Sequence, residues 1–314
     1  MQLLSDKSNN SDTVKFDCWK RINHLSKGVN MKFLVLGCNG MAGHTISIYL
    51  KEQGHDVFGF DRRPSKFIDS VVGDAMDSNA IKDIIGVNKY DSVINCIGLL
   101  NQFAENNKAG AAYLNSYLPH QLAEFTEGTD TQIIHLSTDC VFSGKRGQYT
   151  ETDFKDGESF YDRSKALGEL DDDKNVTLRN SIVGPDINPN GIGLFNWFMQ
   201  QKGEINGFTK AMWTGQTTLQ LAKTMEAAAK VKAHGLYNTV PDTSISKCDL
   251  LGLFNKHIRV NKITINPVNT LVADKSLKRT RWDFDYKVPD YETMVIELGE
   301  WVRAHKDLYP HYEL

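Results

Sequence analysis

Four side chains in the middle of the sequence have the types and spacing needed to protonate a carbonyl oxygen. Thr138 and Asp139 follow a short apolar run, and Tyr161 and Lys165 come later, at the start of a predicted helix. Tyrosine and lysine four residues apart lie on one face of a helix. A phenol ionises near pH ~10, and a neighbouring ammonium lowers that pKa. Tyr161 is expected to act as a general acid toward a ketone oxygen that Thr138 also holds, while hydride reaches the ketone carbon.

A glycine-rich segment near residue 40 has the pattern of a dinucleotide-binding turn. An apolar run over residues 33–36 predicts a buried parallel strand, and Gly37, Gly40 and Gly43 follow it. Gly37 permits a tight turn, Gly40 lets the backbone approach a pyrophosphate, and Gly43 lets the helix over 41–51 pack on the strand. The alternative is an ordinary strand–helix turn without a ligand. The candidate cofactor site also includes Asn39 and Met41.

The second predicted strand, residues 56–60, carries information about which cofactor is bound. It ends at Asp61, where dinucleotide-binding folds hold a ribose hydroxyl. Arg62 and Arg63 follow at once, and arginines at this place clamp a 2′-phosphate instead. NADH and NADPH both stay open, because the two signals point to different cofactors. Further candidate contacts lie at the ends of the next two strands: Asp74, Ala75, Cys96 and Gly98.

Strands and helices alternate through the first two thirds of the chain. We predict strands over 71–74, 91–98, 132–136 and 176–178, and helices over 78–85 and 104–127, the second kinked or split in two by Pro119. This rhythm predicts an α/β fold with a doubly wound parallel sheet, the Rossmann fold, to which a helix over 219–231 and a strand over 235–238 return. The predicted parts are a mobile N-terminal extension (1–30, with a short helix over 16–25), the dinucleotide-binding domain (31–183 with 217–243) and a smaller C-terminal substrate lobe (184–216 and 244–314).

Composition narrows the class of protein. The chain has 314 residues and a net charge of −3, and it carries no long basic run, which argues against a nucleic-acid partner. No apolar run is long enough to span a bilayer. The five cysteines are dispersed, which is typical of reduced thiols in the cytoplasm. The histidines show no metal-ligand spacing, so no metal site is predicted.

The order of these motifs resembles that of the extended short-chain dehydrogenases/reductases, and within them the dTDP-4-dehydrorhamnose reductases. The resemblance extends from Met31 to the C-terminus and is strongest over 137–144, 149–153, 161–165 and Gly168-Glu169. It implies that Thr138, Tyr161 and Lys165 form the catalytic set, with Asp139 ordering the site or relaying a proton. It also implies that Lys165 binds the nicotinamide ribose of NADPH or NADH, and that Trp213 and Arg279 contact a nucleotide-sugar substrate.

Position 140 departs from the family pattern, and so does Asp162, which stands where glycine is common. Related 4,6-dehydratases carry a glutamate directly after the Thr-Asp pair, and the reductases usually carry tyrosine, whereas this chain has Cys140. The thiol argues against dehydration. The resemblance therefore implies reduction of a 4-keto-6-deoxy sugar nucleotide in polysaccharide biosynthesis. An epimerase of the same superfamily and a cofactor-binding regulatory subunit without turnover stay open as alternatives, and a homodimer is possible.

Overall fold

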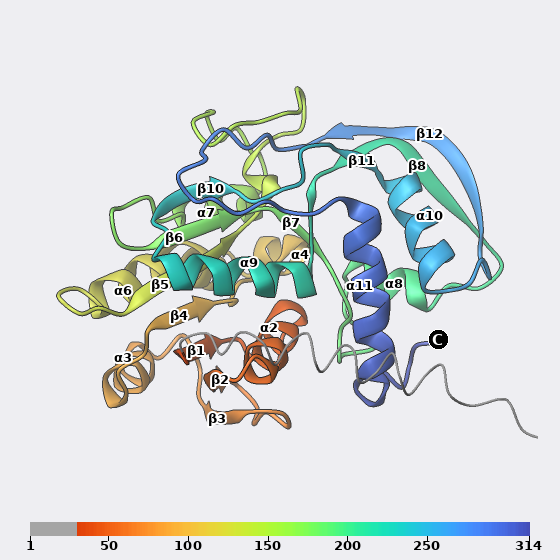
Figure 1. Cartoon of the computed structure of the whole chain (residues 1–314). Helices are drawn as coiled ribbons and strands as arrows, with labels where there is room; N and C mark the ends of the chain where they lie inside the picture. The colour runs from red at the N-terminus through yellow and green to blue at the C-terminus, as the bar shows by residue number, and fades with distance from the viewer. Residues whose placement is uncertain (1–29) are drawn as a thin grey trace, which may run out of the picture.

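The computed structural model of the chain describes residues 30–314. The predicted extension over residues 1–29, with its short helix, lies outside the described residues. A central sheet with helices on both faces forms one part of the molecule, and a smaller lobe built mainly from later segments lies beside it (Figure 1). The architecture therefore has the two parts that the sequence predicts.

Within residues 30–314, the central sheet has seven strands in the order β10-β6-β5-β4-β1-β2-β3, and each neighbouring pair is parallel. The doubly wound parallel sheet is thus confirmed. Its strand order reverses between β1 and β4, the place where such folds bind a dinucleotide. The strands are β1 (Lys32–Leu36), β2 (Asp56–Asp61), β3 (Asp69–Val72), β4 (Ser92–Asn95), β5 (Gln132–Ser137), β6 (Val176–Arg179) and β10 (Gly235–Asn238).

Helices cover both faces of this sheet because its strands are apolar on both sides. On one face α2 (Met41–Glu52) and α9 (Thr218–Val231) pack over Val35, Ile94 and Ile134. On the other face α3 (Ser78–Val87) and α6 (Leu118–Phe125) pack over Leu34, Val93 and Ile133. Successive strand residues point to opposite faces, so the two cores share each strand.

The predicted long helix over 104–127 is wrong as a single element. The structure has α4 (Asn101–Asn106), α5 (Lys108–Ala111), the π-helical segment η1 (Ala112–Tyr117) and then α6. The break falls at Asn107, whose side chain accepts from the N–H of Gly110 and caps α5. Pro119 produces no break, since it lies in the first turn of α6, where an absent N–H costs little.

The lobe combines two small sheets with three helices in the described part of the chain. Strand β8 (Glu204–Trp213) pairs with β11 (Ile245–Ser246) and with β12 (Thr264–Asp274), and β7 (Ser181–Val183) pairs with β9 (Gly215–Thr217). Its core includes Phe195, Phe254 and Trp301. The remaining helices are α8 (Leu194–Met199), α10 (Lys247–His257) and α11 (Tyr291–Ala304), followed by the short turn η3 (Lys306–Leu308).

Two further observations concern the whole described region. None of its helices has the length and apolar character that crossing a membrane requires. Its cysteines, Cys38, Cys96, Cys140 and Cys248, are free thiols.

Candidate active site

The predicted cofactor turn and the predicted catalytic residues meet at the carboxyl ends of β1, β4 and β5, which are neighbours in the sheet. Residues 96–98, directly after β4, form the wall between them. A Cβ placed on Gly37 would lie 3.1 Å from Ile97 Cγ1 and 3.4 Å from the Cys96 carbonyl carbon. On the other side, the charge of Lys165 acts on the Cys96 thiol. The structure thus brings together Gly37, Cys96 and Lys165, which are distant in the sequence.

The glycine turn has the close backbone approaches that its sequence predicts. Gly37 has a φ of +77°, a left-handed conformation that favours glycine. A Cβ on Gly43 would lie 2.1 Å from the Gly37 carbonyl oxygen, so the start of α2 can pack here only without a side chain. Gly40 is the N-cap of α2 and makes no side-chain cap, which leaves the N-terminal N–H groups of the helix available to an anion.

We predict that Gly43→Ala lowers the free energy of unfolding by roughly 1–3 kcal/mol, the usual range for overpacking. The added methyl meets backbone atoms of Gly37, which cannot rotate away as a side chain can. Urea denaturation followed by circular dichroism measures the effect. Gly86→Ala is the matched control, because a Cβ on this helical glycine of α3 meets nothing within 4 Å. Equal stability of the two variants would contradict the assigned role of Gly43.

The residues predicted to select the cofactor lie beside this turn. The Asp61 carboxylate accepts the backbone N–H of Asn39 at 3.1 Å and that of Arg63 at 3.4 Å. The Asn39 side chain donates to the Arg63 carbonyl oxygen at 2.8 Å, so the turn and the end of β2 are joined. Arg62 and Arg63 are exposed, as is Asp74, whereas Ala75 is buried under the sheet edge. Met41 contacts Gly193, at the start of α8 in the lobe.

The four predicted catalytic side chains are buried, with Thr138, Asp139, Tyr161 and Lys165 between 5% and 9% exposed. The Thr138 hydroxyl donates to Asp139 Oδ1 at 3.1 Å and accepts the Cys140 N–H at 3.1 Å. Ser181, at the start of β7, donates to the same Asp139 oxygen at 3.0 Å. Burial raises the pKa of Asp139, while the Lys275 charge and these hydrogen bonds oppose the shift. Asp139 therefore orders the Thr138 hydroxyl.

The structure corrects the predicted pKa of Tyr161. Burial raises the pKa of its phenol above the ordinary value, the nearby Cys140 thiol adds to the rise, and an interaction with the Thr138 side chain opposes it. The lowering expected from Lys165 is absent, because the Lys165 amino group donates to the Leu136 carbonyl oxygen at 2.8 Å and lies 3.3 Å from His135 Nε2. A raised pKa keeps the phenol protonated at neutral pH, which is the form a general acid requires.

The helix that carries Tyr161 and Lys165, α7 (Phe160–Leu167), begins with a complete capping box. The Ser159 hydroxyl accepts the Asp162 N–H at 3.0 Å, and the Asp162 carboxylate accepts the Ser159 N–H at 3.2 Å. Asp162 occupies a position where the resembled family often has glycine. In this chain it therefore fixes the start of α7 at Phe160, the residue before Tyr161.

We predict that Ser159→Ala lowers the free energy of unfolding by about 1 kcal/mol, since one helical N–H loses its cap. The same variant is expected to lower turnover, because Tyr161 sits in the first turn of α7. Thermal unfolding and initial rates check the two effects. Ser159→Thr retains the capping oxygen and should restore both; a Thr variant as impaired as the Ala variant would contradict this explanation.

The two side chains predicted to bind the substrate are engaged elsewhere. Trp213 packs in the lobe core, with its ring 5.7 Å from that of Tyr291. The Arg279 guanidinium donates to the carbonyl oxygens of Arg281 (at 2.7 Å), Phe284 and Tyr286, and it lies 4.6 Å from the Trp282 ring. Trp213 thus helps to hold the lobe together, and Arg279 holds the segment after β12. Both side chains are buried and offer a ligand little surface.

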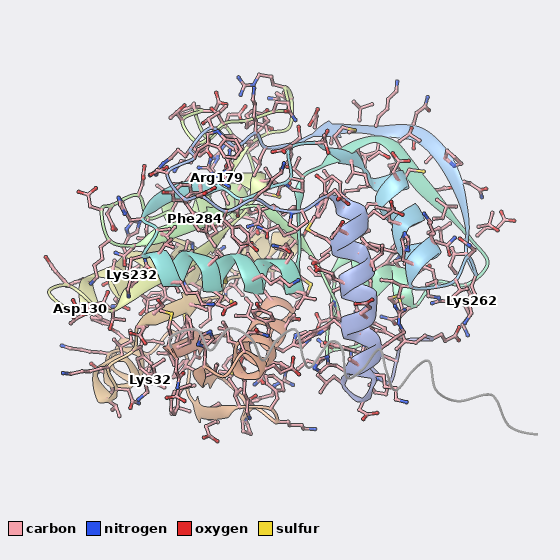
Figure 2. The ribbon with its side chains drawn as sticks, viewed as in Figure 1. Lys32, Asp130, Arg179, Lys232, Lys262 and Phe284 are labelled. Carbon is pink, nitrogen blue, oxygen red and sulfur yellow. The ribbon has the colours of Figure 1, made fainter. Side chains whose placement is uncertain are left out.

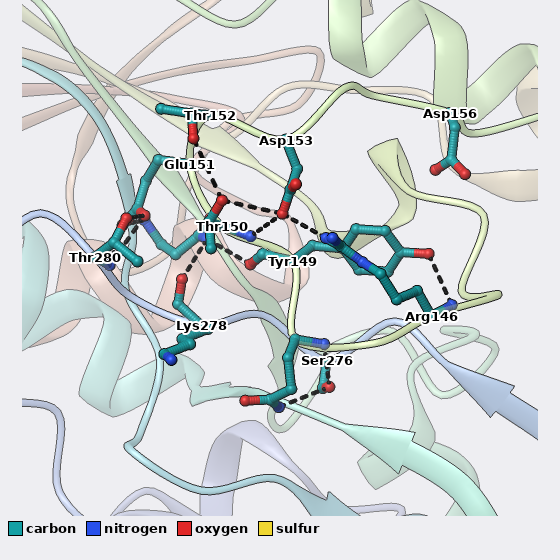
Figure 3. Close-up of polar contacts among 12 residues, drawn as sticks. Arg146, Tyr149, Thr150, Glu151, Thr152, Asp153, Asp156, Ser276, Lys278 and Thr280 are labelled. Carbon is teal, nitrogen blue, oxygen red and sulfur yellow. Dashed lines mark hydrogen bonds and ion pairs between the residues drawn. The ribbon is translucent and has the colours of Figure 1, made fainter.

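Sequence reasoning missed Lys275, which follows β12 and reaches the catalytic segment from the lobe. Its Nζ lies 4.0 Å from Asp162 Oδ2, and its charge acts on both Asp139 and Cys140. The loop over 146–153 is tied to the same stretch of chain (Figure 3). Glu151 accepts the Thr280 N–H at 3.0 Å, and Lys278 donates its N–H to the Tyr149 carbonyl oxygen at 2.8 Å. A basic residue directly before a Ser-Leu pair was the available signal.

Among residues 30–314, no cluster of histidine, cysteine, aspartate and glutamate gathers to hold a metal ion. The described region has two hollows of about 420 Å³ each, one lined by α10 and Ile265 and the other by α3, β2 and β3, and no residue of the Gly37–Gly43 turn or of the catalytic set lines either of them. The candidate active site is therefore identified by its buried side chains near the carboxyl ends of the strands, and neither by a metal cluster nor by one of these hollows.

Comparisons with known proteins agree with this geometry. Residues 31–283 match the model of the RmlD substrate binding domain family. A probable low-salt glycan biosynthesis reductase of Haloferax volcanii, Agl14, is 32% identical over 143 residues, which are 44% of this chain and 48% of that relative. The chain thus matches about half the length of this relative.

Two other likenesses extend over most of the chain. A dTDP-4-dehydrorhamnose reductase of Aggregatibacter actinomycetemcomitans is 24% identical over 309 residues, 90% of this chain and 99% of that protein. The crystal structure of dTDP-4-dehydrorhamnose reductase from Bacillus anthracis in complex with NADP superposes with a TM-score of 0.73 at 17% identity. It covers 87% of this chain and 100% of that one, which establishes the shared fold.

Proposed function

The chain belongs to the RmlD substrate binding domain family, and from this premise we propose that it reduces a 4-keto-6-deoxy sugar nucleotide with NADPH or NADH. The observation that carries the proposal is that Gly37 of the glycine turn and Lys165 of the catalytic set both lie close to Cys96, directly after β4. The names of the reductases that it resembles support the substrate class.

The residues of the turn fit a dinucleotide. The cradle at Gly37 and Gly43 has no room for a Cβ, and the uncapped N-terminus of α2 faces it. Such a cofactor, when bound, supplies hydride. The Asp61 carboxylate is already used by two backbone N–H groups, while Arg62 and Arg63 are exposed and able to pair with a 2′-phosphate. We therefore propose that NADPH binds more tightly than NADH.

Each catalytic side chain has a role that follows from its contacts. Tyr161 donates its phenolic proton to the oxygen that becomes the C4 hydroxyl of the sugar. The Thr138 hydroxyl has one hydrogen, which it donates to Asp139 in this structure; turned to the substrate, the same hydrogen would hold the carbonyl oxygen. Lys165 positions the nicotinamide ribose, and its charge acts on Cys96, which lies beside the glycine turn. Lys275, which follows β12, adds positive charge beside Asp139.

The decisive experiment follows NADPH and NADH oxidation against a panel of enzymatically prepared 4-keto-6-deoxy sugar nucleotides. We expect oxidation with one of them, faster with NADPH. Tightly retained NAD without net oxidation would favour the epimerase alternative instead. Cofactor binding without turnover on any sugar, together with a stoichiometric partner enzyme in a pull-down, would favour the regulatory subunit.

We also propose the domain boundaries that the sequence predicts, with 31–183 and 217–243 binding the cofactor and 184–216 and 244–314 binding the substrate. The strands of the central sheet lie in the first set and those of the β11-β8-β12 sheet in the second, which supports the division. A cytoplasmic location and a homodimer belong to the same proposal. Fractionation of the source cells and light scattering of the purified protein test them.

A further inference from the structure

A buried polar chain runs from Lys165 through His135 to Asn95. Lys165 Nζ lies 3.3 Å from His135 Nε2, and Asn95 Nδ2 lies 3.2 Å from His135 Nδ1. His135 on β5 and Asn95 on β4 are register partners across the sheet, and they are 0% and 1% exposed. Polar groups buried this deeply must satisfy one another, so their donors and acceptors can be assigned.

The Asn95 amide fixes which nitrogen of His135 carries hydrogen. Its Oδ1 accepts the Ile97 N–H at 3.1 Å, so its NH₂ group faces the imidazole. An amide nitrogen only donates, which makes His135 Nδ1 the acceptor. Burial, with the charges of Lys165 and His120, holds the pKa of His135 well below its ordinary value, so the ring is neutral. A neutral imidazole that accepts at Nδ1 carries its hydrogen on Nε2.

This hydrogen points at Lys165. An ammonium group has three donors and no lone pair, so two donors would face each other across 3.3 Å. A neutral amine avoids the conflict, because its lone pair accepts from His135 while one of its hydrogens still goes to the Leu136 carbonyl oxygen.

We propose that His135 is a positioning residue for Lys165: held by Asn95 with hydrogen on Nε2, it keeps the lysine side chain in place as a neutral amine when the cofactor-free protein is in mildly alkaline solution. The inference rests on the proposed function, which it deepens by adding a proton step to cofactor binding. Ribose hydroxyls accept from an ammonium, so a nicotinamide cofactor draws Lys165 away from His135 and into its protonated form. Binding therefore takes up a proton.

The other charged groups around Lys165 determine the pH at which cofactor binding begins to take up a proton. Burial is the largest effect and lowers the pKa of Lys165 to about 8, while Glu169, two residues after the end of α7, and Cys96, after β4, favour the ammonium. His120, from α6, acts on His135. The free protein thus changes its protonation at Lys165 within an accessible pH range.

Nitrogen-15 NMR of the whole chain, labelled at histidine, tests the tautomer without any substrate. Above pH 8, we expect His135 to show hydrogen on Nε2 and none on Nδ1, with its signals assigned by their loss in His135→Gln. Hydrogen on Nδ1, or on both nitrogens, would overturn the proposal.

The affinity for NADPH across pH gives the second readout. In the native protein we expect affinity to fall as pH rises through about 8, where the free amine must first be protonated. In His135→Gln the side-chain oxygen accepts from the ammonium, so the midpoint should rise by roughly one pH unit. His234→Gln, at an exposed histidine that takes no part in this polar chain, is the control and should keep the native midpoint. An unshifted midpoint in His135→Gln would refute the inference. A native protein that binds no NADPH at any pH would instead refute the proposed function, and the NMR measurement alone would then test the role of His135.

Discussion

Replacing Tyr161 with phenylalanine is expected to lower turnover of a 4-keto sugar nucleotide by about 10²–10⁴-fold, the range that general acid catalysis contributes. The phenol is buried and its pKa is raised, so at neutral pH it is a proton donor rather than a phenolate. Phenylalanine preserves the ring and its packing against Ala104 and Ala111 but has no proton to give. Folding and NADPH affinity should therefore survive the change.

The measurement combines single-turnover rates with a NADPH titration, because the two separate chemistry from binding. Tyr113→Phe is the matched control. That tyrosine lies on the neighbouring segment η1, and its hydroxyl donates to Gln121 Oε1 at 3.2 Å, outside the catalytic set. Native turnover in Tyr161→Phe would contradict the proposed role of Tyr161 as proton donor. Equal losses of turnover in the two variants would show that the effect comes from packing.

The sequence predicts the central sheet well because each of its strands is marked by a short apolar run, a signal that depends only on neighbouring residues. A buried apolar run before glycines predicts β1 and the start of α2, and the strand over 235–238 is found as β10 with the same ends. Boundaries shift where flanking polar residues decide them. The third strand lies at Asp69–Val72 instead of 71–74, and the fourth ends at Asn95, because the Asn95 side chain takes the Ile97 N–H and turns the chain.

The helix over 104–127 fails as a prediction for a tertiary reason. Asn115 lies in η1, fully buried, and its side chain bonds the N–H of Leu99 at 2.8 Å and Ser164 Oγ at 3.0 Å. The wider π-helical turn accommodates a side chain that ties the segment to α7. Helical periodicity in the sequence reports the apolar face and carries no information about such a partner.

The candidate site shows the same division between spacing and surroundings. Spacing correctly brings Tyr161 and Lys165 to one helix near the glycine turn. It misses what each group meets there, namely His135 and the Leu136 carbonyl oxygen for Lys165, and the backbone carbonyls that occupy Arg279. Partners that come from another strand or from the backbone leave no pattern in the sequence, so the pKa of Tyr161 was predicted in the wrong direction.

Glu169→Leu is expected to lower the free energy of unfolding by about 3–5 kcal/mol, because it leaves a buried arginine without its partner. Glu169 and Arg179 both have fully buried side chains, and the guanidinium donates from Nε at 2.8 Å and from Nη2 at 2.7 Å. Arg179 lies inside the fold, among the strands (Figure 2). Lys155 and Ser137 also bond the carboxylate, at 2.7 Å and 2.6 Å. The variant therefore leaves the buried donors of Arg179 and Ser137, and that of Lys155, without their acceptor.

The same cluster gives the effect a defined pH dependence. Burial acts to raise the pKa of Glu169, but the hydrogen bond and charge of Arg179, with Lys155, outweigh it and hold the pKa below its ordinary value. A carboxyl group whose pKa is lower in the folded state stabilises fully above its unfolded pKa and loses this contribution as pH falls through the folded one. The difference between native protein and Glu169→Leu should thus be largest near neutral pH and shrink in acid.

Urea denaturation at several pH values measures the effect, with Glu158→Gln as control because its pair with Lys145 is exposed and should change the midpoint little. The loss of stability in Glu169→Leu arises mainly because Arg179 stays buried and charged without a partner, and only partly because the attraction between the two charges is lost. Adding Arg179→Met removes that charge, so the double variant should be more stable than the sum of the two single losses predicts. Strict additivity would show that the two side chains do not act as a buried pair.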